Sequence, residues 1–525
     1  MADDIYVFET LKAAGASTVT DDGSGSDWII IDGGYFGGNL YDTWGSRTYL
    51  GQINSNTPGD GAWIETTQFS PLLYKSLTVF GVIENARGGA GNDLLVGNNG
   101  ANILQGDPFD VAGATDHLSG LGGNDTLLGG GGDDSVDGGD GNDTLFGDND
   151  PFAQDQGNFA SGGDILSGGA GDDVLAGGEG NNTYDGGDGF DTVSYQGFYE
   201  QATFGYRVDC DLNTQIATVY FTDFYDGTEF AVATDRIYPI EQVIGSGGDD
   251  HMKGQDNFSF GLPGSNTLDG GPGNDVITGG YWNDYLFGGA GNDTINDGLS
   301  LGVTGLDELT GGTGDDTYIV NMVCSIFEDA GGGTDTIIAK TSFTIAANVE
   351  KLTLFETPFA IDAAGNGVGN RIIGNSYSNT ISGQGGNDFL SGLAGDDTII
   401  AGTGNDRLTG GLGKDLLTGN AGKDIFDFNA VAESIAALAG RDIITDFNAN
   451  ATDRIDLSTI DANSGLAGNS AFTFHVGAFT GLGQVRVVQN GTDTYIEVNS
   501  TGSLAADMRI QLIGHVVLDE TDFVL

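Results

Sequence analysis

Along much of the chain, single apolar residues stand nine positions apart, and the residues between them are mostly glycine, aspartate and asparagine. The stretch GGGGDDSVDGGDGNDTLFG, from Gly129 to Gly147, shows one period, with Val136 and Leu145 as the apolar residues. Nine residues divide into a glycine-rich turn of about six and a strand of about three, whose apolar side chain points inward. Glycine permits the positive φ values that such a tight turn needs. The pattern therefore predicts short strands joined by tight turns.

A strand this short is unstable alone, but stacked copies bury a continuous apolar column. Two nonapeptides make one coil, with a turn at each edge, and successive coils stack at the strand spacing of about 4.8 Å. The predicted fold class is all-β: a parallel β-roll solenoid in blocks, separated and capped by β-rich segments.

The aspartates follow the same period of nine. An apolar residue stands two positions after nearly every one of them in three separate blocks, which a disordered low-complexity linker would not maintain. The aspartates, with one asparagine, are Asp116, Asp125, Asp134 and Asp143; Asp164, Asp173, Asn182 and Asp191; Asp275, Asp284 and Asp293; and Asp388, Asp397, Asp406, Asp415 and Asp424. The apolar residues are Leu118, Leu127, Val136 and Leu145; Leu166, Leu175, Tyr184 and Val193; Ile277, Leu286 and Ile295; and Leu390, Ile399, Leu408, Leu417 and Phe426.

The charge of the chain requires neutralisation before it can fold. Of 525 residues, 93 are glycine, and the formal net charge is −59. Such a charge opposes compaction and repels nucleic acid and anionic membranes, so neither is an expected partner. However, 38% of the residues are hydrophobic and 10% are aromatic, which is more apolar material than disordered acidic tails contain. The composition indicates a chain that builds a core once cations are bound.

In the predicted coil, the aspartates form two files, one along each edge. Like charges one coil apart repel unless a cation lies between them. Carboxylates and the carbonyl groups of glycine turns are ligands that calcium prefers, and magnesium, with its stricter octahedral geometry, is the second choice. Bound calcium then supplies the folding free energy that glycine and charge remove. The predicted calcium ligands are Asp93, Asp116, Asp125, Asp134, Asp143, Asp164, Asp173, Asp191, Asp275, Asp284, Asp293, Asp316, Asp388, Asp397, Asp406, Asp415 and Asp424.

The repeat resembles the RTX (repeats-in-toxin) calcium-binding nonapeptide G-G-x-G-x-D-x-U-x. The resemblance covers Gly88–Ser194, Ile244–Ile319 and Gly365–Phe428. Gly440–Ile460 is similar to the segment that follows the roll in serralysin-type proteases, and the ending DETDFVL (Asp519–Leu525) is similar to that of type I secretion substrates. The resemblance implies a parallel β-roll with calcium between stacked turns. It also implies export from a Gram-negative bacterium by a type I exporter that reads an uncleaved C-terminal signal.

The N-terminal sequence lacks the basic start and apolar core of a signal peptide, and no apolar run approaches the about 20 residues that span a bilayer. Together with the export that the resemblance implies, these features predict a secreted protein, extracellular or at the cell surface of a Gram-negative bacterium, without a transmembrane segment. The only cysteines, Cys210 and Cys324, lie in different segments, and nothing in their spacing indicates a disulfide.

The repeated blocks alternate with stretches that do not repeat. The predicted organisation is an N-terminal β cap (1–87), a first roll block (88–194), an aromatic β insertion (195–243), a second block (244–319), a β spacer (320–364), a third block (365–428), and a C-terminal cap with the secretion signal (429–525).

Local patterns in the non-repeat stretches predict individual elements. Ser26–Gly33 reads as a strand because of its β-branched content. Arg207–Phe221 reads as strand, turn and strand, with Val208, Cys210 and Leu212 on one face. Ala430–Gly440 is the best helix candidate, with Gly440 as a C-cap.

Catalytic signatures are weak. The four histidines, His117, His251, His475 and His515, are too far apart for the H-E-x-x-H motif of a zinc protease. GLSLG (Gly298–Gly302) fits the letters of G-x-S-x-G, but no α/β context surrounds it, so Ser300 is expected to be a loop serine. Paired carboxylates are uninformative in a chain this acidic.

The turn GGYWND (Gly279–Asp284) replaces its second glycine with Trp282, which puts the usual turn geometry in doubt. Packing against a neighbouring segment is the favoured interpretation there, and an exposed aromatic contact for a partner or sugar is the alternative.

The sequence thus predicts a secreted calcium-binding protein with a non-catalytic structural role, such as a cell-surface, surface-layer-like, matrix or adhesive protein. The alternative is an extracellular hydrolase or epimerase-type enzyme with a small site in 1–87 or 195–243. A membrane-active protein is disfavoured because apolar segments are absent. The expected partners are multiple calcium ions and a type I exporter, and either a second copy of the chain or a cell-surface glycan.

Two insertions interrupt the period in the first block. The repeat aspartate that the period places at position 111 is found instead at Asp116, and the one that it places at position 152 is found at Asp164. Counting repeats places both insertions on the same edge, two coils or about 10 Å apart. We therefore predict that they form one projecting feature with Phe109 close to Phe152.

Overall fold

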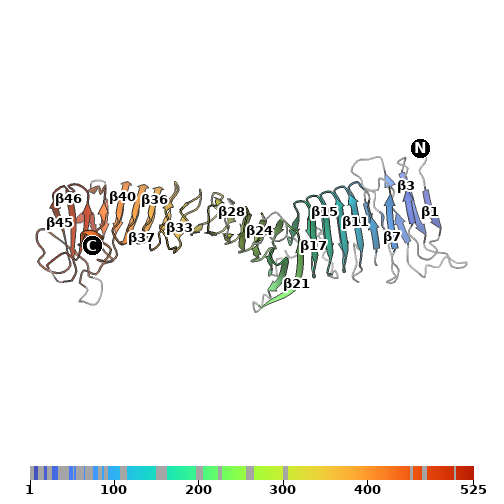
Figure 1. The fold of residues 1–525 in the computed structure, drawn as a ribbon, viewed down its shortest axis with the longest axis horizontal. Coiled ribbons are helices and arrows are strands. Elements are labelled where there is room, and N and C mark those ends of the chain that lie inside the picture. The colour runs from blue at the N-terminus through green and yellow to red at the C-terminus, as the bar shows by residue number, and fades with distance from the viewer. Residues whose placement is uncertain are drawn as a thin grey trace. The chain divides into compact units, whose positions relative to one another are not determined.

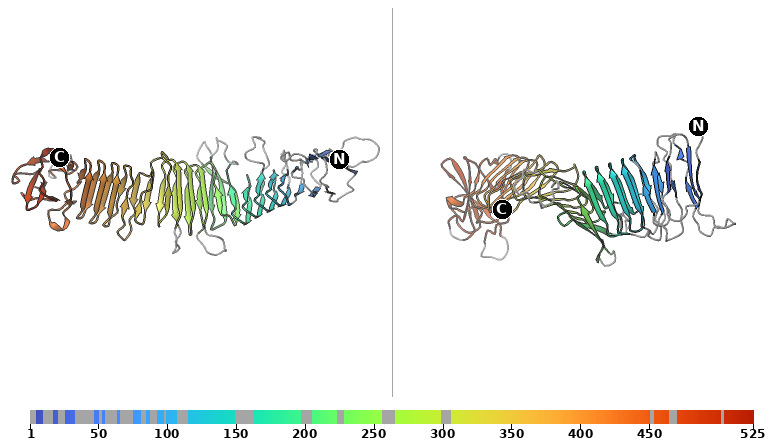
Figure 2. Two further views of the ribbon diagram at one scale, coloured as in Figure 1. Left: turned by 90° about the horizontal axis from the view of Figure 1, so that it is seen from above. Right: turned by 45° about the vertical axis from the view of Figure 1, so that its right-hand side comes forward.

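The computed structural model describes the strands between residues 5 and 87, and residues 93–97, 99–106, 115–148, 162–196, 205–222, 228–255, 265–298, 306–449, 453–463, 470–501 and 504–525. The chain divides into two compact units, Met1–Gly289 and Ala290–Leu525, and each is described by itself. In both units, parallel strands stack along two sheets, and consecutive strands alternate between them (Figures 1 and 2). The predicted all-β roll is confirmed.

The first unit is built on the first repeated block. One sheet contains β9 (Asp93–Val96), β11 (His117–Gly122), β13 (Ser135–Asp140), β15 (Ile165–Ala170) and β17 (Thr183–Asp188). The other contains β10 (Ile103–Gln105), β12 (Thr126–Gly130), β14 (Thr144–Asp148), β16 (Val174–Ala176) and β18 (Thr192–Ser194). Leu118 pairs with Val136, and Leu127 pairs with Leu145. Each coil therefore contains two nonapeptides, as predicted.

Strands before Arg87 continue both sheets. They are β1 (Ile5–Glu9), β2 (Ser17–Thr20), β3 (Ser26–Asp32), β4 (Arg47–Leu50), β5 (Ile53–Asn54), β6 (Ile64–Glu65), β7 (Lys75–Phe80) and β8 (Asn85–Arg87). β7 pairs in parallel with β9, and β8 with β10, so this segment leads directly into the roll. The strand predicted at Ser26–Gly33 is present as β3.

The aromatic insertion adds a hairpin to one sheet and leaves the other uninterrupted. β20 (Ile216–Thr222) pairs antiparallel with both β19 (Gly205–Asp211) and β21 (Glu229–Tyr238), while β21 pairs in parallel with β17, and β19 with β23 (His251–Lys253). In the opposite sheet, β18 pairs directly with β22 (Gln242–Ile244). β24 (Thr267–Pro272), β25 (Val276–Gly280) and β26 (Tyr285–Ala290) continue the sheets. Val208, Cys210 and Leu212 are buried on one face of the hairpin, as predicted.

In the second unit, one long sheet contains β27 (Thr294–Gly298), β29 (Thr317–Val320), β31 (Thr336–Ala339), β33 (Lys351–Leu354), β35 (Arg371–Ile373), β37 (Phe389–Ala394), β39 (Arg407–Leu412), β41 (Ile425–Asp427), β43 (Arg454–Asp456) and β48 (Phe523–Val524). β28 (Glu308–Thr313) pairs with β30 (Ser325–Phe327). A further sheet runs through β32 (Phe343–Thr344), β34 (Ala363–Ala364), β36 (Thr380–Gly385), β38 (Thr398–Thr403), β40 (Leu416–Ala421), β42 (Ile443–Ile444), β47 (Met508–Leu512), β46 (Asp493–Asn499), β45 (Gln484–Asn490) and β44 (Thr473–His475). The 320–364 segment therefore contributes strands to the same stack.

The helix predicted at Ala430–Gly440 is absent, and only the 3₁₀ turn η1 (Leu438–Gly440) forms there. Tertiary contacts decide this segment. The Ser434 hydroxyl donates to the carbonyl oxygen of Arg509 and accepts the N–H of Asp442, and Ile435 forms a β-bridge with Met508. Bonds to distant strands thus replace the local bonds of a helix.

The predicted apolar column is the core of both units. Every apolar residue that stands two positions after a repeat aspartate is at most 2% exposed. Phe109 and Phe152, predicted to lie together, are outside the described residues. The strands that precede the two insertions, β10 and β14, do lie in the same sheet with β12 between them, as the two-repeat coil requires.

Candidate metal centre

The repeat aspartates form files in which each carboxylate holds the backbone of the preceding coil. Oδ1 of Asp143 accepts the N–H of Asp125 at 2.7 Å, and Oδ1 of Asp173 accepts the N–H of Asp143 at 2.7 Å. The first unit contains one file through Asn102, Asp125, Asp143, Asp173 and Asp191 and another through Asp116, Asp134, Asp164 and Asn182. The second unit contains files through Asn370, Asp388, Asp406 and Asp424 and through Asn379, Asp397 and Asp415. One file precedes the strands of each sheet.

In many of the aspartates, the second carboxylate oxygen has no protein partner. All the predicted ligands from Asp116 to Asp424 are at most 3% exposed. The Oδ2 atom is buried without a hydrogen-bond partner in Asp125, Asp143, Asp164, Asp173, Asp191, Asp316, Asp388, Asp397, Asp406, Asp415 and Asp424. A buried carboxylate oxygen without a partner is costly, so its repetition along each file indicates a missing positive group. The side chain of Asp93, at the start of β9, lies outside the described part.

A backbone carbonyl oxygen faces the same space as several of the unpartnered carboxylate oxygens. A Cβ built on Gly120 would stand 2.6 Å from the carbonyl oxygen of Gly138 and would collide with Oδ2 of Asp125. A Cβ on Gly392 would meet the carbonyl oxygen of Gly410 at 2.6 Å and Oδ2 of Asp397 in the same way. A side chain at Gly120 or Gly392 would therefore enter the space between these oxygens.

The files carry an electrostatic cost that a cation removes. The pKa of Asp388 is raised to about 7, mainly by burial; the Asn370 N–H lowers the pKa, and the Asp406 carboxylate raises it. The pKa of Asp397 is also raised to about 7, mainly by burial and then by the Asp415 carboxylate. Closely spaced carboxylate and carbonyl oxygens at low local dielectric are the ligand set of a hard cation, and they fit calcium.

Sequence reasoning missed several residues that continue the files. Asp235 accepts the N–H of Asn182, Glu241 that of Asp191, Asp442 that of Asp415, and Asp453 that of Asp424. Asp250, Asp335 and Glu350 accept backbone N–H groups in the same manner. Each is followed two positions later by a buried apolar residue, namely Ile237, Val243, Ile444, Ile455, Met252, Ile337 and Leu352. This acid-x-apolar signal identifies them even where the spacing of nine is broken.

Several turns keep their geometry without glycine. Leu121, Gln384, Leu393 and Asn420 each stand four positions before a file aspartate, and each has a positive φ of 63–76°. Trp282, two positions before Asp284, has φ 94°. The altered GGYWND turn therefore retains its left-handed residue, at the steric cost of placing a bulky side chain there. Both Tyr281 and Trp282 are half-buried. This burial is compatible with packing against a neighbouring segment and with contact to a partner or sugar, so both interpretations stay predictions.

Comparison with known proteins identifies the repeats. The profile of the RTX calcium-binding nonapeptide repeat (4 copies) matches residues 83–110, 112–150, 160–193, 260–295, 365–399 and 400–432. The chain carries RTX calcium-binding repeats. These repeats bind multiple Ca²⁺ ions, which matches the unpartnered oxygens of the files.

Two solved structures resemble parts of this RTX chain. The solution structure of the AlgE6R2 subunit of the Azotobacter vinelandii mannuronan C5-epimerase has 24% sequence identity and a TM-score of 0.23, over 30% of this chain and 92% of that one. The AlgE6R3 subunit of the same enzyme has 28% identity and a TM-score of 0.15, over 30% of this chain and 78% of that one. No curated protein matches the chain significantly.

Other predicted features have simple outcomes. Cys210 and Cys324 are free thiols, both buried. No helix among the described residues has the length and apolar character needed to cross a bilayer. Ser300 lies outside the described residues.

Proposed function

We propose that this chain is a secreted calcium-binding RTX protein with a non-catalytic structural role at the cell surface or in an extracellular matrix. The observation that supports a structural role is the way in which the two oxygens of the repeat carboxylates are engaged. In aspartates such as Asp406 and Asp415, Oδ1 anchors the preceding coil and the buried Oδ2 is left for calcium, so these acidic groups serve the solenoid itself.

The same observation supports secretion. Extracellular calcium sites bind with dissociation constants of about 10⁻⁴–10⁻³ M, and such sites fill outside a cell but not in the cytosol. A chain whose coils require calcium therefore stays unfolded until it has been exported. We propose export through a type I exporter of a Gram-negative bacterium, with the signal in Asp519–Leu525.

Sedimentation of the full chain at saturating calcium tests the structural role. Ordered assemblies that dissolve in chelator are expected, because a cell-surface or matrix component contacts further copies of itself or a surface glycan. A monodisperse monomer at every calcium and protein concentration would contradict a self-assembling role. If that monomer also turned over a polysaccharide or ester substrate, the enzyme alternative would replace the proposal.

A further inference from the structure

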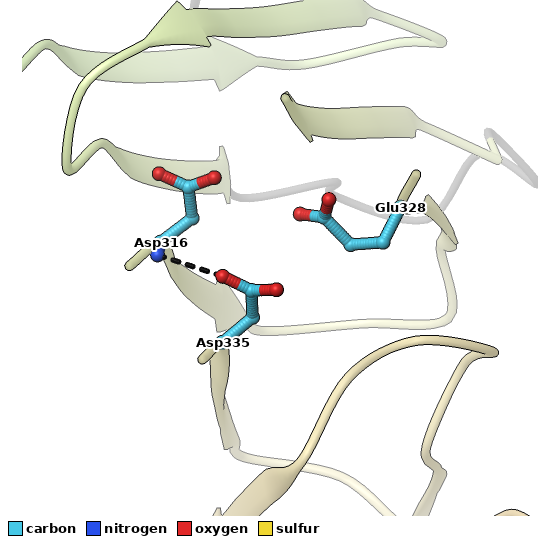
Figure 3. A group of neighbouring side chains, drawn as sticks. All are labelled: Asp316, Glu328 and Asp335. Atoms are coloured by element: carbon cyan, nitrogen blue, oxygen red, sulfur yellow. Dashed lines mark hydrogen bonds between the residues drawn. The ribbon is translucent and has the colours of Figure 1, made fainter. Parts of the chain in front are cut away.

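The second unit contains a further file, through Asp293, Asp316, Asp335 and Glu350, and an additional carboxylate joins it. Asp316 and Asp335 are consecutive file members, and the N–H of Asp316 donates to Oδ1 of Asp335 at 2.9 Å. Glu328 follows β30, in the 320–364 segment, and its carboxylate points toward the two aspartates (Figure 3). One oxygen from each of the three residues lies within 4.8 Å of the others. Within the described residues, no other three His, Cys, Asp or Glu side chains come so close.

The oxygens of this cluster separate into those with partners and those without. Oδ1 of Asp316 accepts the N–H of Asp293, Oδ1 of Asp335 accepts that of Asp316, and the Tyr318 hydroxyl donates to Oε1 of Glu328. The remaining oxygens, Oδ2 of Asp316, Oδ2 of Asp335 and Oε2 of Glu328, are buried without a hydrogen-bond partner. Asp316 and Asp335 are each only 1% exposed, so water does not readily reach their unpartnered oxygens to supply a hydrogen bond.

The backbone leaves room for an ion at this point. A Cβ on Gly311 would collide with Oδ2 of Asp316 and with Oε1 of Glu328, so the absence of a side chain at position 311 keeps these oxygens accessible to each other. A Cβ on Gly332 would stand 2.6 Å from the carbonyl oxygen of Gly312 and 3.1 Å from Oε2 of Glu328. A backbone carbonyl therefore lies beside the carboxylates, as at the repeat sites.

We propose that Asp316, Glu328 and Asp335 bind one calcium ion in a site that the nonapeptide pattern does not specify. The third carboxylate comes from a segment outside the repeats and adds a negative charge that an ordinary pair of file aspartates lacks. Calcium affinity rises with the charge count and rigidity of the ligands, so this site fills before the repeat sites. The inference rests on calcium binding alone and is independent of the proposed structural role.

Terbium luminescence tests the site in the full chain. Tb³⁺ replaces Ca²⁺ at carboxylate sites, and excitation of tyrosine sensitises an ion bound beside it. Tyr318, bonded to Glu328, is the tyrosine placed to do this. Substoichiometric terbium should give luminescence in the wild type that falls strongly in Tyr318→Phe. Equal luminescence in the two proteins would overturn the proposal, whatever the other variants show.

Glu328→Gln removes the charge while keeping an oxygen for the Tyr318 hydroxyl. Its affinity for the first terbium or calcium ion should fall by roughly tenfold or more, the scale of losing one supporting ligand at a metal site. The matched control is Asp329→Asn, which removes the same charge from the exposed neighbouring residue and should leave this affinity unchanged. Equal first-ion affinities in wild type and Glu328→Gln, or an equal fall in both variants, would contradict a specific site.

Discussion

The backbone N–H of Asp397 donates a hydrogen bond to Oδ1 of Asp415, 18 residues later, with a distance of 2.8 Å between N and Oδ1. Both side chains are buried, and Oδ2 of each has no hydrogen-bond partner. The bond that holds one coil on the next therefore also brings two carboxylates into a poorly solvated file, where their charges repel. Folding of the roll thus depends on a cation that neutralises the file.

Chelation should unfold the repeat blocks. Glycine entropy and carboxylate repulsion oppose the fold when calcium is absent, and the binding free energy of many ions is then lost. Circular dichroism should show a β spectrum in calcium and a largely disordered one in excess chelator. A β spectrum in chelator that does not change when calcium is added would contradict calcium-dependent folding.

Asp143→Asn should weaken the local calcium sites. The amide oxygen can still accept the N–H of Asp125, but the charge and the unpartnered Oδ2 are lost. We expect roughly tenfold weaker binding locally with the fold retained, because the stability of a solenoid is approximately a sum over neighbouring repeats. Asp140→Asn, an exposed substitution in the same coil with the same charge change, is the control for calorimetric titration. Identical titrations of the two variants would exclude Asp143 as a ligand.

The calcium-free chain should regain β structure as the pH is lowered. In the folded state without calcium, burial raises the pKa of Asp125, Asp173 and Asp424 to about 7, far above the unfolded value of about 3.9. Groups with a raised pKa contribute stability that is complete below the unfolded pKa and is lost as the pH rises through the folded one. Calcium affinity should correspondingly increase up to a pH of about 7–8, with protons released on binding.

Circular dichroism of calcium-free protein across this pH range measures the effect. High salt at alkaline pH is the control, since it screens repulsion without removing the cost of burying the charges. The prediction fails if the spectra at acid and alkaline pH are the same, or if salt alone restores the β signal.

Leu393→Gly should stabilise the calcium-loaded protein. Leu393 has φ 76°, a conformation that costs an ordinary residue about 1–2 kcal/mol, and its side chain is 45% exposed. Glycine loses about 0.5–1 kcal/mol through its greater unfolded-state entropy, so a net gain of about 0.5–1 kcal/mol is expected. Leu412→Gly, at the 52% exposed last residue of β39 and without a positive φ, should instead lower Tm. A decrease in Tm for both variants would argue against strain at Leu393.

Removal of Asp519–Leu525 should leave the protein inside the cell. In the folded state this segment forms the 3₁₀ turn η3 (Glu520–Asp522), capped by Asp519, and then β48, in which Phe523 pairs with Ile455 of β43. Ile455→Ala is the control, because it disturbs the same packing without altering the terminal sequence. Normal secretion of the truncated chain would show that the signal lies elsewhere, and retention of both variants would point to a folding defect.

The sequence alone determined the repeating part of the structure. The period of nine predicted the apolar residues of the core, the two-repeat coil and the paired files, because each repeat contacts mainly identical neighbours one coil away. Leu118 pairs with Val136, and Leu390 with Leu408, as equivalent positions of successive coils. A local pattern is sufficient where the same local structure recurs.

Only the tertiary structure decided which residues complete the files where the period breaks. Asp235 accepts a hydrogen bond from the N–H of Asn182, 53 residues earlier, because the aromatic insertion lies between them. After Asp335, the next member of the file is Glu350, a glutamate instead of an aspartate. The Ala430–Gly440 segment fails to form a helix because Ser434 and Ile435 bond to β47 and its neighbours. These outcomes depend on hydrogen bonds between segments far apart in the chain. Neither the period of nine nor local propensity specifies how many residues separate two file members where the repeat is broken. The position of the Glu328 carboxylate beside Asp316 and Asp335 is therefore evident only in the folded chain.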